Sequence, residues 1–133
     1  MKKDNIVQIK SYEFALLCIK LFQNLSKNKK EYILSKQILR SGTSIGANIE
    51  EAIGGQSTKD FLHKLSISYK EARETHYWLR LLRDSAYISK EESIVLIEKC
   101  EELLRIIGSI QKTTKARNSY FVIRNSQFVI RNS

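Results

Sequence analysis

Proline is absent from this chain of 133 residues, and glycine occurs only five times. Because these two residues are the strongest helix breakers, their scarcity favours long uninterrupted helices. Hydrophobic residues make up 42% of the chain, which excludes an intrinsically disordered polymer. Length and composition therefore predict a single all-α domain.

Cysteine and long apolar runs are also scarce. Cys18 and Cys100 are the only cysteines, so the chain has neither a zinc-binding motif nor a disulfide framework. Each cysteine lies within an apolar helical stripe, which indicates a small buried hydrophobic residue. No apolar run resembles a signal peptide or a membrane span. We therefore expect a cytoplasmic protein without a membrane partner.

Acidic residues are few: 14 Asp and Glu against 23 Lys and Arg, for a formal net charge of +9. Residues 113–133 contain no acid and four basic residues, Lys115, Arg117, Arg124 and Arg131. Such a surplus favours polyanions such as RNA, DNA or anionic lipid. The plainer alternative is charge that only keeps the protein soluble.

Apolar residues at three- and four-residue steps predict four helices, at residues 11–26, 31–53, 57–86 and 90–112. Their short connections predict an antiparallel up-down-up-down four-helix bundle.

Local signals mark the expected helix ends. Ser11 and Ser57 are expected N-caps, and Ser89 with Glu92 forms a capping box. Gly54-Gly55 is expected to end the second helix. Small residues at positions 42 and 46 predict a kink or a close helix crossing.

The C-terminal segment contains a tandem repeat. Asn118-Ser-Tyr-Phe-Val-Ile-Arg is followed by Asn125-Ser-Gln-Phe-Val-Ile-Arg, without the apolar spacing of a coiled coil. We expect residues 1–115 to form the bundle domain and residues 116–133 a poorly ordered tail. Our hypothesis is that a short DNA repeat was translated beyond the original domain.

The third predicted helix has two apolar stripes. One comprises Phe61, Leu65, Tyr69, Ala72, His76, Leu79, Leu82 and Ala86 and is expected to face the core. The other lies nearly opposite and comprises Ile67, Glu71, Glu74, Trp78 and Leu81. Since a lone bundle covers one stripe only, the second predicts an interface with copies of the same chain.

Two motifs carry a family resemblance over about residues 8–112. Ser44-Ile-Gly-Ala-Asn-Ile-Glu-Glu-Ala resembles the Ser-Ile-x-x-Asn-Ile-Ala-Glu-Gly signature of bacterial four-helix-bundle proteins, also called 23S rRNA intervening-sequence proteins and sometimes labelled ribosomal proteins. The segments Lys59-Asp60-Phe61-Leu62 and Lys70 to Leu82 resemble that family's third helix. The chain departs from the signature at Glu50, Ala52 and Gly46, where the family has alanine, glycine and often proline.

The resemblance implies a left-handed four-helix bundle that forms a homopentamer. Some members are encoded within insertions in large-subunit ribosomal RNA genes. A similar protein, the accessory variability determinant of diversity-generating retroelements, is a basic pentamer that binds nucleic acid and a reverse transcriptase. No enzymatic activity is established for the family, and no cofactor is implied.

Four polar residues of the second helix share a strip beside its apolar face: Arg40, Ser44, Asn48 and Glu51. The strip is either a ligand or RNA site or a structural polar network at a helix or subunit boundary. We favour the network, because buried polar groups usually serve as satisfied structural contacts.

Metal and acid–base catalysis find little support. A di-metal site in a bundle needs Glu-x-x-His on two helices, and the chain has no such motif. His76 lies on the core stripe without an acid or nucleophile at helical spacing, so a core histidine is the better interpretation. We therefore expect no enzyme, no metal site and no cofactor.

Basic residues recur on outward positions of the second and third helices. The candidate nucleic-acid-binding residues are Lys36, Arg40, Lys64, Lys70, Arg73, Arg80 and Arg83. Tyr77 and Tyr87 could stack bases, and core packing or simple exposure explains these two tyrosines equally well. The predicted function is a non-enzymatic homo-oligomeric scaffold that binds RNA or DNA. The alternative is an interaction module that docks a partner protein, such as a nucleic-acid enzyme.

Overall fold

The structure is a computed structural model that describes the backbone of residues 3–132 and the side chains of residues 6–119 and 124. It contains four helices, α1 (Lys3–Lys27), α2 (Leu34–Ile53), α3 (Thr58–Asp84) and α4 (Lys90–Asn132). Within residues 3–132 there is no strand, so the all-α class is confirmed. Among the described residues, no helical segment combines the length and the hydropathy of a membrane span.

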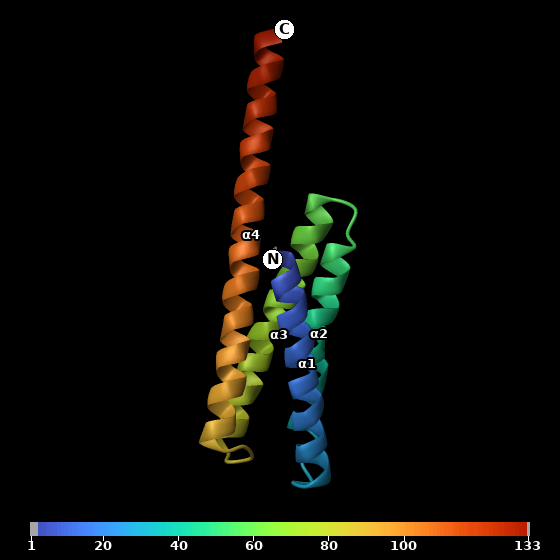
Figure 1. The fold of residues 1–133 in the computed structure, drawn as a ribbon, viewed down its shortest axis with the longest axis vertical. Coiled ribbons are helices and arrows are strands. Elements are labelled where there is room, and N and C mark those ends of the chain that lie inside the picture. Colours follow the sequence, from blue (N-terminus) through green and yellow to red (C-terminus); the bar gives the residue numbers. More distant parts are fainter. Residues whose placement is uncertain (1–2, 133) are drawn as a thin grey trace.

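The chain turns back at each short connection, as Figure 1 shows. Helix α1 packs on α2 and α4, and α3 packs on the same two helices. The four helices thus surround a core that runs along the bundle. The left-handed sense of the bundle stays a prediction.

The core is built from one apolar side of each helix. Its largest fully buried side chains include Phe14 and Leu25 of α1, Ile45 of α2, Leu79 of α3 and Ile107 of α4. Both cysteines are buried as predicted, and burial raises the pKa of Cys18 and of Cys100 to about 12. They are therefore neutral packing groups at physiological pH.

Helices α1 and α2 cross closely at Gly42, where the sequence predicted a close crossing. A Cβ atom added at Gly42 would lie 2.4 Å from the Sγ and 2.9 Å from the Cβ of Cys18. Real Cβ atoms do not approach other atoms so closely, so this position requires glycine at the observed helix separation. One turn further, a Cβ at Gly46 would lie 3.3 Å from the Oγ of Ser11.

Hydroxyl groups in the core bond to backbone or to each other. Thr75 Oγ1 lies 2.9 Å from Ser41 Oγ, and Ser68 Oγ donates to the carbonyl of Ile45 at 2.8 Å. Among the described side chains, no buried nitrogen or oxygen lacks a hydrogen-bond partner. These contacts tie α2 to α3 without leaving a buried polar atom unsatisfied.

Two of the predicted caps are present. Ser57 Oγ accepts from the amide of Asp60 at 3.1 Å, and Ser89 Oγ accepts from the amide of Glu92 at 3.1 Å. The Glu92 carboxylate lies 3.4 Å from the Ser89 hydroxyl rather than reaching the Ser89 amide. The predicted capping box is therefore formed only in its first half.

The start of α2 uses a cap that the sequence analysis missed. The carboxylate of Glu31 accepts hydrogen bonds from the amides of Ile33, Leu34 and Ser35, at 3.1, 3.0 and 2.8 Å. Burial opposes the charge of this carboxylate, but the three amide donors together hold its pKa below the ordinary value. Helix α2 consequently begins at Leu34 rather than at residue 31.

The first helix begins earlier than the predicted residue 11. Ser11 is not a cap: it is buried within α1, and its hydroxyl donates to the carbonyl of Gln8 at 3.1 Å. The helix extends back to Lys3 because Val7 is also buried in the core. Ala86, predicted as a core residue, is exposed in the α3–α4 turn with a φ of 64°.

The last helix is longer than predicted. Its end was expected near Lys112, but α4 continues to Asn132 and projects beyond the other helices in Figure 1. Residues 109–132 contain neither glycine nor proline, so no residue there interrupts the helix. The side chains of the repeat beyond Ser119, Arg124 excepted, and residue 133 lie outside the described part. The division at residue 115 stays a prediction.

Candidate nucleic-acid interface

The surface of α3 that points away from the core carries basic and aromatic residues. They recur at steps of three, four and seven, which places them on one side of the helix. All six are exposed: Lys59, His63, Lys70, Arg73, Tyr77 and Arg80. We call this set the outer strip of α3. Its C-terminal half, from Lys70 to Arg80, spans about 15 Å along the helix axis.

The seven predicted nucleic-acid-binding residues fall into two groups. Arg40 pairs with Glu71 and Glu74, Lys64 with Glu51, and Arg83 with Asp84. In the described part of the chain, the other four form no ion pair, namely Lys36, Lys70, Arg73 and Arg80. Of these only Arg80 acts on a carboxylate: the hydrogen bond from Arg83 and the nearby charge of Arg80 lower the pKa of Asp84. Of the seven predicted residues, those without an ion pair therefore lie on the outer strip of α3, except Lys36 on α2.

Arg40 joins α2 to α3 through two carboxylates. Its Nη1 donates to Glu71 at 3.0 Å, and its Nη2 donates to Glu74. The hydrogen bond to Glu74, together with both nearby negative charges, raises the pKa of the Arg40 guanidinium. Glu71 and Glu74 lie on the stripe that was predicted to contact copies of the chain, but the arginine that pairs with them belongs to the same chain.

Trp78 belongs to this cluster as well. Its indole Nε1 donates to Glu74 at 3.3 Å, and its ring packs partly against the core. Ile67 and Leu81, which belong to the same stripe of α3, are also half-buried. Contacts within the same chain thus cover much of the stripe that was predicted to form an interface. Its role in self-association stays a prediction.

Tyr77 stands beside this cluster on the outer strip. Its ring centroid lies 5.2 Å from that of Trp78, in an edge-on arrangement with an interplanar angle of 62°. The guanidinium carbon of Arg80 lies 5.6 Å from the same Tyr77 centroid. With 47% of the residue exposed, the ring is accessible from solvent.

The four residues of the predicted polar network act separately. Ser44 Oγ donates to the carbonyl of Arg40, and Asn48 Nδ2 donates to the carbonyl of Ser44, both along α2 itself. Arg40 and Glu51 instead reach across to α3, where Glu51 meets Lys64. The strip therefore stabilises α2 and its contact with α3 through local bonds.

His76 is half-buried at the edge between α3 and α4 rather than in the deep core. Its Nε2 lies 3.7 Å from the carboxylate of Glu101. Within the part of the chain whose side chains are described, no three His, Cys, Asp or Glu residues gather to hold a metal ion.

An exposed apolar strip on α1 escaped the sequence analysis. Ile9, Tyr12 and Leu16 are 45%, 65% and 48% exposed, at steps of three and four residues on one side of the helix. These three residues, hereafter the α1 apolar strip, line a shallow groove with Gln8 and Glu50. Their regular spacing is visible in the sequence, but the predicted start at residue 11 left Ile9 outside the helix.

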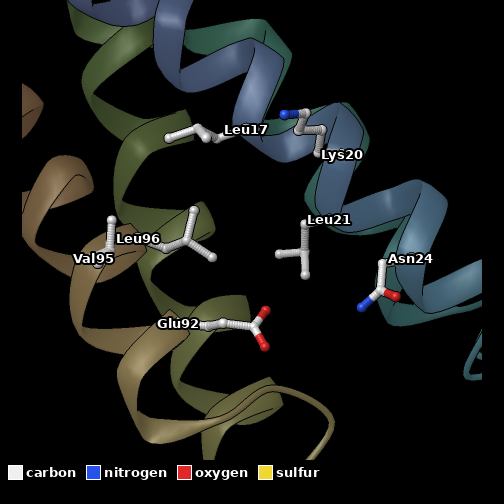
Figure 2. A pocket seen from close by; sticks show the side chains of 7 residues that line it. All are labelled: Leu17, Lys20, Leu21, Asn24, Glu92, Val95 and Leu96. Carbon is white, nitrogen blue, oxygen red and sulfur yellow. The ribbon is translucent and has the colours of Figure 1, made fainter.

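A second groove lies between α1 and α4. It encloses about 390 Å³, and Figure 2 shows Leu17 and Leu21 of α1 facing Leu96 of α4 across it. Lys20 and Asn24 on α1 and Glu92 on α4 supply its polar lining. The groove is open because α1 and α4 are the least closely packed neighbours in the bundle.

Comparison with known proteins places these features in a family. Residues 3–109 match the family model described as 23S rRNA-intervening sequence protein. A crystal structure of a protein with unknown function from the S23 ribosomal protein family of Bacteroides thetaiotaomicron is similar, with 49% identity and a TM-score of 0.82. The match covers 84% of this chain and 99% of that one. Among curated proteins, none matches the chain.

Proposed function

The chain belongs to the 23S rRNA-intervening sequence protein family, and on that premise we propose that it is a non-enzymatic scaffold that binds RNA through the outer strip of α3. One observation carries this proposal: Lys70, Arg73 and Arg80 share an exposed helical strip, and in the described structure none of the three forms an ion pair. Unpaired cations on one side of a helix match the regular charge of a phosphate backbone. Cytoplasmic localisation is part of this proposal.

Self-association would strengthen such binding. We propose a homo-oligomer, with five subunits as the family resemblance implies, so that each modest basic surface is repeated around the assembly. Repeated contacts to one polyanion raise the overall affinity far above that of a single surface. The half-buried stripe of Ile67, Trp78 and Leu81 and the α1 apolar strip are the two surfaces that support a subunit contact.

The test of RNA binding uses charge-matched variants. A labelled RNA is titrated with the wild type, with Lys70→Ala/Arg73→Ala, and with Lys27→Ala/Lys29→Ala as the control of equal net charge. Lys27 is the last residue of α1 and Lys29 follows it in the α1–α2 connection, and both are exposed. We expect the Lys70/Arg73 variant to bind more weakly and to show a smaller salt dependence, because each lost phosphate contact removes about 0.7 from the slope on single strands. Absence of binding by the wild type at low salt would refute the proposal, and so would equal losses in both variants.

Docking of a partner protein is the second candidate function. The observation that favours it is the α1 apolar strip, since exposed apolar side chains in a row are typical of protein contacts. A pull-down from native lysate, with and without nuclease, separates the two functions. Partners that survive nuclease and are lost with Tyr12→Glu support docking, whereas partners lost with nuclease support RNA binding.

Light scattering on a sizing column tests the assembly. Charged substitutions at Ile67 and Trp78 should give helical monomers if the α3 stripe forms the subunit contact. If Leu16→Glu alone gives monomers, the contact lies on α1. A wild-type protein that elutes as a monomer over a wide concentration range would refute the oligomer.

A further inference from the structure

We propose that the outer strip of α3 selects unpaired RNA over duplex RNA, with Tyr77 as a platform on which one base stacks. This inference rests on the proposed RNA binding and names its substrate class. Tyr77 lies near the C-terminal end of the strip, with Arg73 one turn before it and Arg80 one turn after it. Because Arg80 lies over one face of the Tyr77 ring, a base would stack on the other face, and the neighbouring cations would contact the phosphates on either side of it.

The Tyr77 ring is held in place before any ligand arrives. Trp78 contacts it edge-on at 5.2 Å between ring centroids, and Arg80 lies 5.6 Å from its centroid. Trp78 is in turn bonded to Glu74, which is paired with Arg40 of α2. A side chain fixed in this way loses less conformational entropy on binding than a mobile one.

Stacking discriminates between the two forms of RNA. In a duplex each base is already covered by its neighbours, and the side chains of a protein reach mainly phosphates and 2′-hydroxyls. In a single strand or loop a base can turn outward and lie against an aromatic ring. A strip of lysine and arginine alone would bind both forms. A preference for unpaired RNA therefore indicates that the Tyr77 ring takes part in binding.

The experiment compares two probes at low salt by fluorescence anisotropy. One is a labelled oligouridylate of about 12 nucleotides, and the other is a fully paired RNA duplex of the same length. The variants are Tyr77→Ala, Tyr77→Phe, and Tyr32→Ala as the control. Tyr32 is 52% exposed in the α1–α2 connection, outside the strip.

We expect the wild type to bind the single strand more tightly than the duplex. Tyr77→Ala should lose roughly tenfold in affinity for the single strand, which is the usual effect of removing one stacked base, and should bind the duplex nearly as before. Tyr77→Phe should bind like the wild type because stacking needs the ring and not the hydroxyl. Tyr32→Ala should also be unchanged.

The outcomes distinguish base stacking on Tyr77 from the RNA binding on which this inference rests. If Tyr77→Ala binds the single strand like the wild type while Lys70→Ala/Arg73→Ala is weakened, RNA binding stands and stacking is wrong. If Tyr77→Ala weakens both probes equally, or changes the oligomer in light scattering, the ring serves another contact and the inference is also wrong. No binding of either probe by the wild type overturns both proposals. Circular dichroism of each variant confirms that the helices are intact.

Discussion

Two glycines within helices should respond in opposite ways to the same substitution. Gly42→Ala places a methyl group 2.4 Å from the Sγ of Cys18, whereas Gly108→Ala places one 3.7 Å from Cε2 of Tyr69, an ordinary contact. Both substitutions gain about 1 kcal/mol of helix propensity relative to glycine. Only Gly42→Ala forces two packed helices apart.

The expected magnitudes follow from these contacts. Overpacking a core costs about 1–3 kcal/mol, and the separation at Gly42 places this site near the upper end. After the gain in propensity, Gly42→Ala should destabilise the bundle by about 2 kcal/mol. Gly108→Ala should stabilise it by about 0.5–1 kcal/mol, since its added methyl group has room.

Urea unfolding followed by far-UV circular dichroism measures both changes, at one protein concentration because self-association would contribute to stability. The double variant Gly42→Ala/Cys18→Ala provides a further check. It should recover only part of the loss, since the Cβ of residue 18 still lies 2.9 Å from the added methyl group. A Gly42→Ala protein at least as stable as the wild type would show that this reasoning about the α1–α2 crossing is wrong.

Three more predictions concern the cap, the extension and the core thiols. Glu31→Gln should lower the free energy of unfolding by about 1 kcal/mol at neutral pH. Because the pKa of the Glu31 carboxyl is lowered in the native protein, its stabilising contribution is present above the ordinary pKa of 4.5 and fades as the pH falls below it. The unfolding curves of the variant and the wild type should therefore converge in acid. A chain that ends at Lys115 should keep its cooperative unfolding and its oligomer size, and loss of either would show that residues 116–133 are structural. Cys18 and Cys100 should react with a thiol reagent only as fast as the bundle opens, because both are buried with a pKa of about 12; rapid labelling of the native protein would contradict this.

The parts of the fold that depend on a single helix were predictable from sequence. Apolar spacing identified four helices, and the Ser57 cap was correctly placed because its hydrogen bond is local. Exposure of Lys70, Arg73 and Arg80 follows from helical periodicity alone. These features require no knowledge of how one helix sits against another.

Features that depend on the register between helices were not predictable. The pairing of Arg40 with Glu71 and Glu74 requires α2 to lie beside α3 at one particular height, and no local pattern encodes that height. Ser11 illustrates a local signal with two solutions. Its hydroxyl can cap a helix start or bond to a carbonyl one turn back within a helix, and burial of Val7 beneath the first turns favours the second.

The one tryptophan of the chain gives the molecule a built-in optical reporter. Its indole lies edge-on to Tyr77 and is bonded to Glu74, so its emission reports on both the ring and the α2–α3 seam. A nucleic acid that binds to the outer strip of α3 should quench the fluorescence of Trp78, so no attached dye is needed. One unlabelled sample would then allow occupancy and unfolding to be followed together.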